Sequence, residues 1–163
     1  MSSYADALLE FYNGEVGGEA LYSTLLGSAR NHDEVLKWST LLQLETETKA
    51  WLRAPMVAHG VSIVEQAEER EKAVALARTI KSLAWNDLMQ QMRDVLSNEI
   101  VPKYQTQVDA ARERGKEDEV AVCVFMVEHE KAQAEFARRE LAGASLDESL
   151  APVVKFLKYQ IRR

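Results

Sequence analysis

The feature that most constrains this fold is helical periodicity sustained over four long stretches of the chain. In each stretch apolar residues recur three or four positions apart, which places them on one face of an α-helix. Only 7 glycines and 3 prolines occur in 163 residues, and this scarcity disfavours a sheet with many turns. The pattern therefore predicts four long helices, at residues 4–29, 34–58, 82–114 and 117–142.

The links between these helices indicate their order in space. Residues 30–33 and 114–116 are short links, which join antiparallel neighbours. Between the two hairpins, Ser62 and Glu65 have the spacing of a capping box and predict a shorter helix to about residue 80 within a long crossover. We expect one all-α domain over residues 1–163, a four-helix bundle of two antiparallel hairpins. An irregular helical domain with steeper packing angles is the alternative.

Two further signals concern the third helix and the end of the chain. Pro102 falls inside the third predicted helix, where we expect a kink or a local loosening. Ser145 and Glu148 form a second capping box, which predicts a short C-terminal helix to about residue 161. Residues 155–163 are basic and amphipathic. Packing on the bundle is the favoured interpretation, and docking on a membrane surface or a partner is the alternative.

Charge and cysteine content exclude several classes of protein. The net charge of −6 gives no basic footprint for nucleic acid. The N-terminus lacks the layout of a signal peptide, and the longest apolar run, residues 120–127, is too short to span a bilayer. The single cysteine, Cys123, forms no internal disulfide and no zinc-binding pair. We expect a cytoplasmic protein without membrane or nucleic-acid partners.

Polar residues interrupt the apolar face of every long helix. Glu15, Glu45, Glu99 and His129 each fall where an apolar residue is expected. The spacing from Glu15 to Glu45 is 30 residues, as is that from Glu99 to His129, so the four side chains lie level to within about 3 Å. Buried carboxylates need a cation or hydrogen-bond donors. The sequence therefore predicts that four potential metal ligands converge at mid-height.

Three glycines lie in the middle of the first helix. Gly14, Gly17 and Gly18 each cost about 0.5–1 kcal/mol relative to alanine in a helix interior. A helix tolerates this cost best where a neighbour or a ligand needs room. We favour a continuous helix, and a break into two pieces is the alternative.

These residues resemble the rubrerythrin and ferritin-like superfamily. Its members carry Glu on the first and third helices and Glu-x-x-His on the second and fourth. The first-helix resemblance rests on Gly14-Glu15 followed by Gly18 and Tyr22, and the third-helix resemblance on Glu99 followed by Tyr104 and by two alanines at 110–111. The resemblance extends over residues 4–143 and implies a carboxylate-bridged iron or manganese centre.

The chain also departs from the family pattern. Thr48 stands where the second helix should supply histidine, and Met126 stands where the fourth should supply glutamate. Three states remain open. One is a dinuclear iron or manganese site that recruits other carboxylates, from Glu19, Glu128 and Glu130. Another is a mononuclear iron, manganese or zinc site held by Glu15, Glu45, Glu99 and His129. The third is a metal-free remnant neutralised by Lys49, by water or by pairing among the carboxylates.

The resemblance implies redox chemistry with dioxygen or peroxide. Glu15 and Glu99 are then terminal ligands, Glu45 a bridging or shared ligand and His129 the nitrogen donor, with Tyr22 and Tyr104 as hydrogen-bond partners of the ligands. Electrons come from an external donor because the chain lacks the cysteines of a rubredoxin domain, and we expect a homodimer. The rival hypothesis is a metal-free bundle that acts as an interaction or small-molecule binding module. Iron storage is a third option.

Overall fold

The computed structural model describes residues 3–159, and these residues contain helices and no strand. The expectation of an all-α chain is therefore confirmed. No helix in this range is long and apolar enough to cross a membrane. In chain order the helices are α1 (Tyr4–Leu26), α2 (His32–Ala58), α3 (Ala67–Ile80), α4 (Trp85–Val95), the π-helix η1 (Leu96–Ile100), α5 (Val101–Glu113), α6 (Glu117–Leu141) and α7 (Leu146–Val154).

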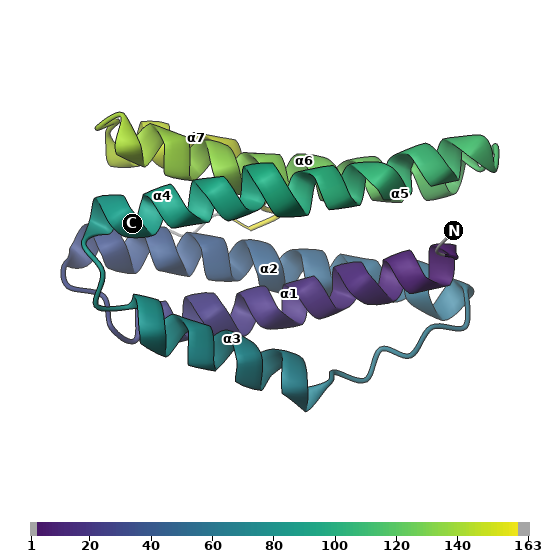
Figure 1. The fold of residues 1–163 in the computed structure, drawn as a ribbon, viewed down its shortest axis with the longest axis horizontal. Helices are drawn as coiled ribbons and strands as arrows, with labels where there is room; N and C mark the ends of the chain where they lie inside the picture. The colour runs from purple at the N-terminus through teal and green to yellow at the C-terminus, as the bar shows by residue number, and fades with distance from the viewer. Residues whose placement is uncertain (1–2, 160–163) are drawn as a thin grey trace.

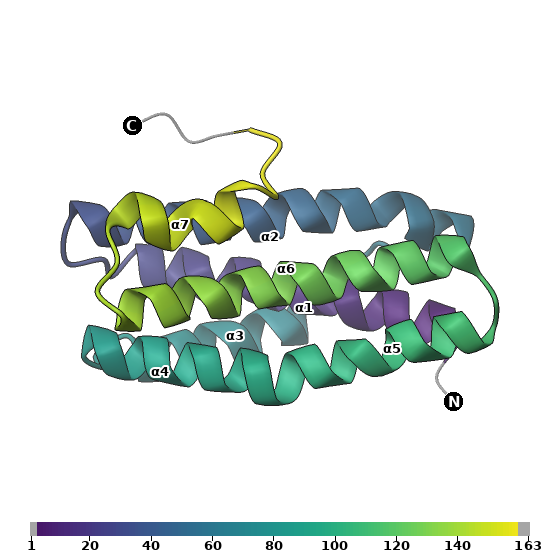
Figure 2. The ribbon, with the colours of Figure 1, turned by 90° about the horizontal axis from the view of Figure 1, so that it is seen from above.

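Two helical hairpins lie side by side in a bundle-like arrangement (Figure 1). In the first hairpin α1 packs against α2. In the second, α4, η1 and α5 form one uninterrupted rod that packs against α6 (Figure 2). The connection between the hairpins contains α3, which lies along α1, while α7 packs against α6 and α2.

Most helix ends follow the local signals in the sequence. The Asn31 side chain accepts a hydrogen bond from the backbone N–H of Glu34 at 2.9 Å and caps α2. Ser145 and Glu148 form the predicted capping box at the start of α7. Gly60 ends the turn after α2 with φ at +69°, a conformation that side chains with a Cβ rarely adopt. Helix α1 runs unbroken through its three glycines, as predicted.

The crossover and the C-terminal helix differ from prediction. Helix α3 begins at Ala67, so the capping box predicted for Ser62 and Glu65 is wrong. The Ser62 hydroxyl accepts from the backbone N–H of Val64, and the Glu65 carboxylate is drawn instead to the Lys49 ammonium at 2.5 Å. Helix α7 ends at Val154, well before the predicted end at residue 161, which itself lies outside the described residues.

The expected loosening at Pro102 takes the form of a π-helical turn. Proline lacks the N–H for an α-helical hydrogen bond, and its ring crowds the carbonyl four residues earlier. The π-helix η1 immediately precedes this proline. A π-turn holds more residues than an α-turn and shifts every later side chain around the helix axis. Leu96, at the start of this turn, is buried, whereas Val95 is 45% exposed.

A polar layer separates two hydrophobic clusters. The cluster at the N-terminal end of α1 contains Phe11 and Met126, and the cluster at the other end contains Leu41 and Phe136. The residues between them on α1, α2 and α6 are buried and polar or charged: Glu15, Glu45, Thr48, His129, Glu130 and Gln133. The two clusters therefore hold this layer between them at mid-bundle.

One hydrogen bond anchors the start of the crossover to the first hairpin. The Tyr12 hydroxyl donates to the carbonyl of Ile63 at 2.9 Å. Because the ring is otherwise retained, Tyr12→Phe should lower the free energy of unfolding by about 1 kcal/mol. Amide hydrogen exchange in residues 61–66 should accelerate. Chemical denaturation and exchange mass spectrometry measure these two effects, and unchanged exchange in this segment would show that the bond does not anchor the crossover.

Candidate metal centre

Three of the four predicted ligands meet in the polar layer. Glu15 from α1, Glu45 from α2 and His129 from α6 each place a potential ligand atom within 4.8 Å of the other two. His129 Nε2 lies 3.2 Å from Glu45 Oε1 and 3.6 Å from Glu15 Oε1. All three side chains are buried. Two carboxylates and an imidazole therefore converge from three helices that are widely separated in the sequence.

Glu99 does not join this group. It lies on the π-helix η1 and is exposed, so the prediction that it points inward is wrong. The predicted apolar face ran through Val95, which is largely exposed, whereas the rod turns its neighbour Leu96 to the interior. Regular α-helical spacing fails to place residue 99 because the irregular turn begins at residue 96.

Two further residues on α6 belong to the layer: Glu130, which the sequence offered only as a substitute ligand, and Gln133, which was not predicted. Glu130 is buried, and its Oε1 lies 4.0 Å from His129 Nε2. Gln133 lies one turn after His129 and is also buried. Helix α6 packs against α4, α5 and α7, so its buried face is wider than one narrow line of residues. The spacing of four residues from His129 was the available signal for Gln133.

Lys49 does not neutralise the inward carboxylates. Its ammonium pairs with Glu19 and with Glu65, the latter at 2.5 Å. Arg70 joins the same ion cluster through Glu65 at 3.4 Å. Within residues 3–159, no lysine or arginine pairs with the carboxylates at positions 15, 45 and 130. The predicted neutralisation by Lys49 is therefore wrong.

A hydrogen-bond network orients the group. Gln133 Nε2 donates to Glu45 Oε1 at 2.8 Å, while Gln133 Oε1 accepts from the Tyr22 hydroxyl. The same amide nitrogen lies 2.8 Å from His129 Nε2, and Thr48 Oγ1 lies 3.1 Å from His129 Nδ1. When Nδ1 donates to Thr48, the lone pair of Nε2 faces Gln133 and the carboxylates. This tautomer is the one that binds a metal through Nε2.

The two tyrosines predicted as partners differ in their roles. Tyr22 reaches the ligands only through Gln133. Tyr104 is buried edge-on against Phe11 and makes no recorded hydrogen bond to a ligand within residues 3–159. Its hydroxyl instead lies 2.8 Å from the point where a side chain at Gly14 would begin. Tyr22 thus orients the site indirectly, and Tyr104 forms part of its surroundings.

The buried carboxylates of the polar layer have to be neutralised by protons or by a cation. Both carboxylate oxygens of Glu15 are buried without a hydrogen-bond partner among the described residues. Burial, followed by repulsion from Glu45 and Glu130, raises the pKa of Glu15 well above its ordinary value. Burial likewise raises the pKa of Glu130 to about 7. Burial lowers the pKa of His129, but the hydrogen bond and charge of Glu45 outweigh it and leave that pKa raised.

A divalent cation suits this donor set. The ionised carboxylates of Glu15, Glu45 and Glu130 carry three negative charges beside one imidazole, and a divalent ion offsets two of them. Mixed carboxylate and imidazole ligands suit iron, manganese and zinc. The partnerless oxygens of Glu15 are the lone pairs that such an ion would take. The residues present therefore fit a metal ion.

Comparisons with known proteins add no constraint. The chain matches no protein family model, no curated protein and no solved structure.

Gly18 makes room for Glu45. A Cβ at position 18 would lie 2.0 Å from Glu45 Oε2, whereas one at Gly17 would meet its nearest neighbours only at 3.9 Å. We expect Gly17→Ala to stabilise the protein by about 0.5–1 kcal/mol through helix propensity. Gly18→Ala should lose that gain and displace the Glu45 carboxylate. Thermal denaturation of the two variants tests this difference, and equal stabilisation by both would contradict the close approach.

Without metal, the free energy of unfolding should fall as pH rises, because the buried acids of the polar layer then have to ionise. The pKa of Glu15 in the folded state lies above the ordinary glutamate value of 4.5, which means that folding favours the protonated form. The stabilisation is fully present below about pH 4.5 and is lost as pH rises through the raised pKa. The raised pKa values of Glu130 and His129 act in the same direction.

Urea denaturation of chelator-treated protein between pH 5 and 8 measures this effect. Glu15→Gln keeps the shape of the side chain and removes its charge. The variant should be more stable than the parent at pH 8, with a flatter dependence on pH. Parallel pH profiles for the two proteins would refute the assignment of Glu15 as a buried, unneutralised acid.

Proposed function

We propose that this chain is a ferritin-like metal-binding protein in which Glu15, Glu45 and His129 hold one iron or manganese ion. The observation that carries the proposal is the pair of buried Glu15 oxygens without partners, beside a second carboxylate and an imidazole. Glu130, 4.0 Å from His129 Nε2, is near enough to join after a small side-chain movement. Three or four ligand side chains suit one ion better than two, which need a fuller set.

Fold and site together favour the ferritin-like interpretation. Ferritin-like bundles place inward carboxylates and histidines from facing helices around a metal, and they connect two hairpins by one long crossover. Here α1 and α2 supply Glu15 and Glu45, while α6 of the other hairpin supplies His129. The ligands thus come from both hairpins at one level, as such a centre requires.

The chemistry that a bound iron or manganese ion supplies is redox chemistry with dioxygen or peroxide. The chain's own residues would balance the charge of the ion and orient its ligands. Glu15 and Glu45 compensate positive charge, Thr48 contacts Nδ1 of His129, and Gln133 fixes Glu45 with support from Tyr22. The only cysteine, Cys123, is buried in the apolar core. Turnover as an oxidoreductase therefore requires an external electron donor.

The rival candidate is a metal-free bundle that serves as a small-molecule or interaction module. Because Lys49 is held by Glu19 and Glu65, such a protein must keep its buried carboxylates neutral by binding protons. The two candidates therefore differ in what neutralises Glu15. Metal content distinguishes them directly.

We predict about one iron or manganese ion per chain in protein purified without chelators and loaded with either metal. Glu15→Gln, Glu45→Gln and His129→Gln should each lower metal affinity by at least about tenfold. Glu99→Gln is the matched control, because Glu99 is exposed and should leave the content unchanged. Elemental analysis by mass spectrometry measures the stoichiometry.

Stability provides a second measure of the same event. At a free metal concentration of 100 times the Kd, binding should stabilise the parent by about 2.7 kcal/mol, seen as a higher Tm. Metal-free parent protein after loading, or full retention of metal by His129→Gln, would overturn the proposal. A rise in Tm that persists in all three ligand variants would place the metal elsewhere.

A further inference from the structure

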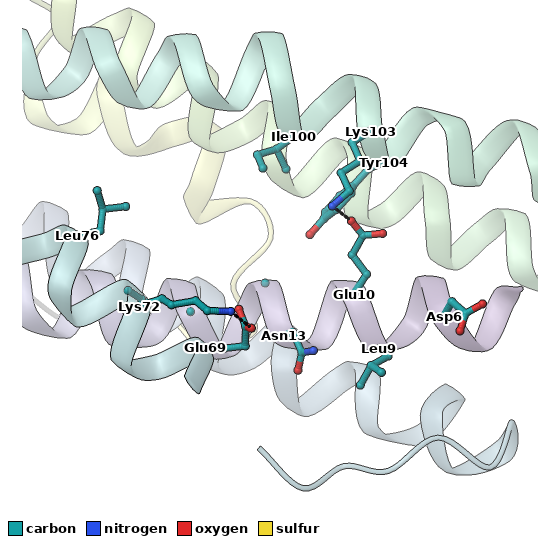
Figure 3. A pocket seen from close by; sticks show the side chains of 13 residues that line it. Asp6, Leu9, Glu10, Asn13, Glu69, Lys72, Leu76, Ile100, Lys103 and Tyr104 are labelled. Atoms are coloured by element: carbon teal, nitrogen blue, oxygen red, sulfur yellow. Dashed lines mark hydrogen bonds and ion pairs between the residues drawn. The ribbon is translucent and has the colours of Figure 1, made fainter. Parts of the chain in front are cut away.

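Two adjoining cavities follow the seam between α1 and the rod formed by α4, η1 and α5. Helix α1 packs against α2 and α3 and makes few contacts with α5, so this seam is not closed by helix packing. One cavity, of about 720 Å³, lies among α1, α3 and α5 (Figure 3). The other, of about 170 Å³, lies among α1, α3 and α4. Both are lined by Leu76 of α3, and we call them together the seam groove.

One end of the seam groove, which we call the polar end, carries five charged side chains with a surplus of acid. Figure 3 shows Lys103 extending from α5 toward Glu10 on α1, and Lys72 meeting Glu69 on α3. Both lysines that line this end are therefore already paired, and the third acid there, Asp6, adds negative charge. The buried Oδ1 of Asn13 has no hydrogen-bond partner among the described residues. This end offers a hydrogen-bond acceptor and excess negative charge to a ligand.

The other end of the seam groove is apolar. Its walls come mainly from α1, α3 and α4, with Trp38 of α2 and Leu96 of η1, and its polar groups belong to Gln91, Tyr22 and the Trp38 indole. The Tyr22 hydroxyl is already engaged by Gln133. The remaining lining is aliphatic or aromatic, mainly Leu21, Leu25, Leu88, Met92 and Leu96. Such walls favour an aliphatic chain, because burying each methylene contributes favourably to binding.

The groove runs along the wall of the candidate metal centre. Gly14, which lines the polar end, directly precedes Glu15. Tyr104 stands in the same wall, with its hydroxyl against Gly14. At the apolar end Tyr22 connects through Gln133 to Glu45. A ligand that lies along the groove is thus separated from Glu45 by the side chains of Tyr22 and Gln133 at the apolar end. At the polar end it lies beside Gly14, the residue before Glu15.

We infer that the seam groove binds a linear amphiphile, with an aliphatic chain at the apolar end and a neutral or cationic hydrogen-bond-donating head at the polar end. Primary alkylamines and alcohols have this chemistry. A carboxylate head is disfavoured, because it meets Glu10, Glu69 and Asp6 and finds both lysines paired. That the amphiphile is the substrate of the metal centre rests on the proposed function, whereas its binding is measurable without metal.

Titration calorimetry of chelator-treated protein with octylamine, octanol and octanoate tests the inference. Octylamine and octanol should bind at one site per chain, and octanoate should bind at least about tenfold more weakly. Hexylamine should bind more weakly than octylamine by about fourfold for each methylene lost. Equal or tighter binding of octanoate would overturn the assigned head group. The absence of binding by all of the probes would overturn the site.

Substitutions on the groove wall locate the site. Val95 lines the apolar end and is 45% exposed, so Val95→Trp should fill the groove without disturbing the core. It should weaken octylamine at least about tenfold. Val57→Trp is the matched control, because Val57 is exposed on α2 and does not line the groove. Loss of binding in both variants, or in neither, would show that octylamine binds elsewhere.

A pair of variants separates this inference from the proposed function. Glu15→Gln should lose metal and keep its affinity for octylamine to within a few-fold, whereas Val95→Trp should keep metal and lose octylamine. Asn13→Leu should reduce the preference for octylamine over octanoate, because it removes the acceptor at the polar end. Retention of the full preference in Asn13→Leu would refute the role of Asn13. If Glu15→Gln loses metal as expected but neither the parent nor any variant binds octylamine, the groove assignment is refuted and the proposed metal site stands.

Discussion

The burial of the Glu15 carboxylate beside Glu45 and His129 is the interaction on which the middle of this molecule depends. A buried charge without a partner is costly, and a second nearby carboxylate increases the cost. The surrounding side chains relieve part of it: Gln133 donates to Glu45, and Thr48 lies against His129. The hydrophobic clusters on either side supply the stability that lets the layer persist. Glu15 has no such donor among the described residues, so its carboxylate has to be neutralised by a proton or a cation.

Two glutamates one turn apart on α1, Glu15 and Glu19, differ in whether a cation or a hydrogen-bond donor contacts them. Glu19 is partly buried, yet it contacts the ammonium of Lys49 and the hydroxyl of Thr46. Glu15 has neither kind of partner. Lys49 also draws Glu65 to the same point and so holds the beginning of the crossover against the first hairpin. Lys49, which directly follows Thr48 of the layer, thus stabilises the connection between the hairpins and does not neutralise the buried acids.

Much of the fold could be predicted from the sequence, because its signals are local. The capping box at Ser145 and the short link at residues 114–116 act within a few residues, and the structure contains both. The convergence of Glu15, Glu45 and His129 could also be predicted, because regular helices keep their periodicity over many turns.

The predictions fail where the position of a residue depends on the helices packed around it. Glu99 was misplaced because periodicity does not register an irregular turn. Glu130 was predicted only as a substitute ligand, because the width of the buried face of α6 depends on how many helices surround it. The partners of Lys49 depend on where the crossover returns, which the spacing of residues does not specify.

The π-helical turn η1 determines which faces of α4 and α5 point to the interior of the bundle. Before it, Leu88 and Met89 belong to one hydrophobic cluster, and after it Tyr104 and Val108 belong to the other. These two sets do not lie on one continuous α-helical line, and the surplus residue in η1 brings both to the interior. Deleting one residue there would turn one half against the other by about 100°. The length of this turn therefore keeps the two ends of the molecule in register, and single-residue insertions or deletions at 96–100 should be among the least tolerated in the chain.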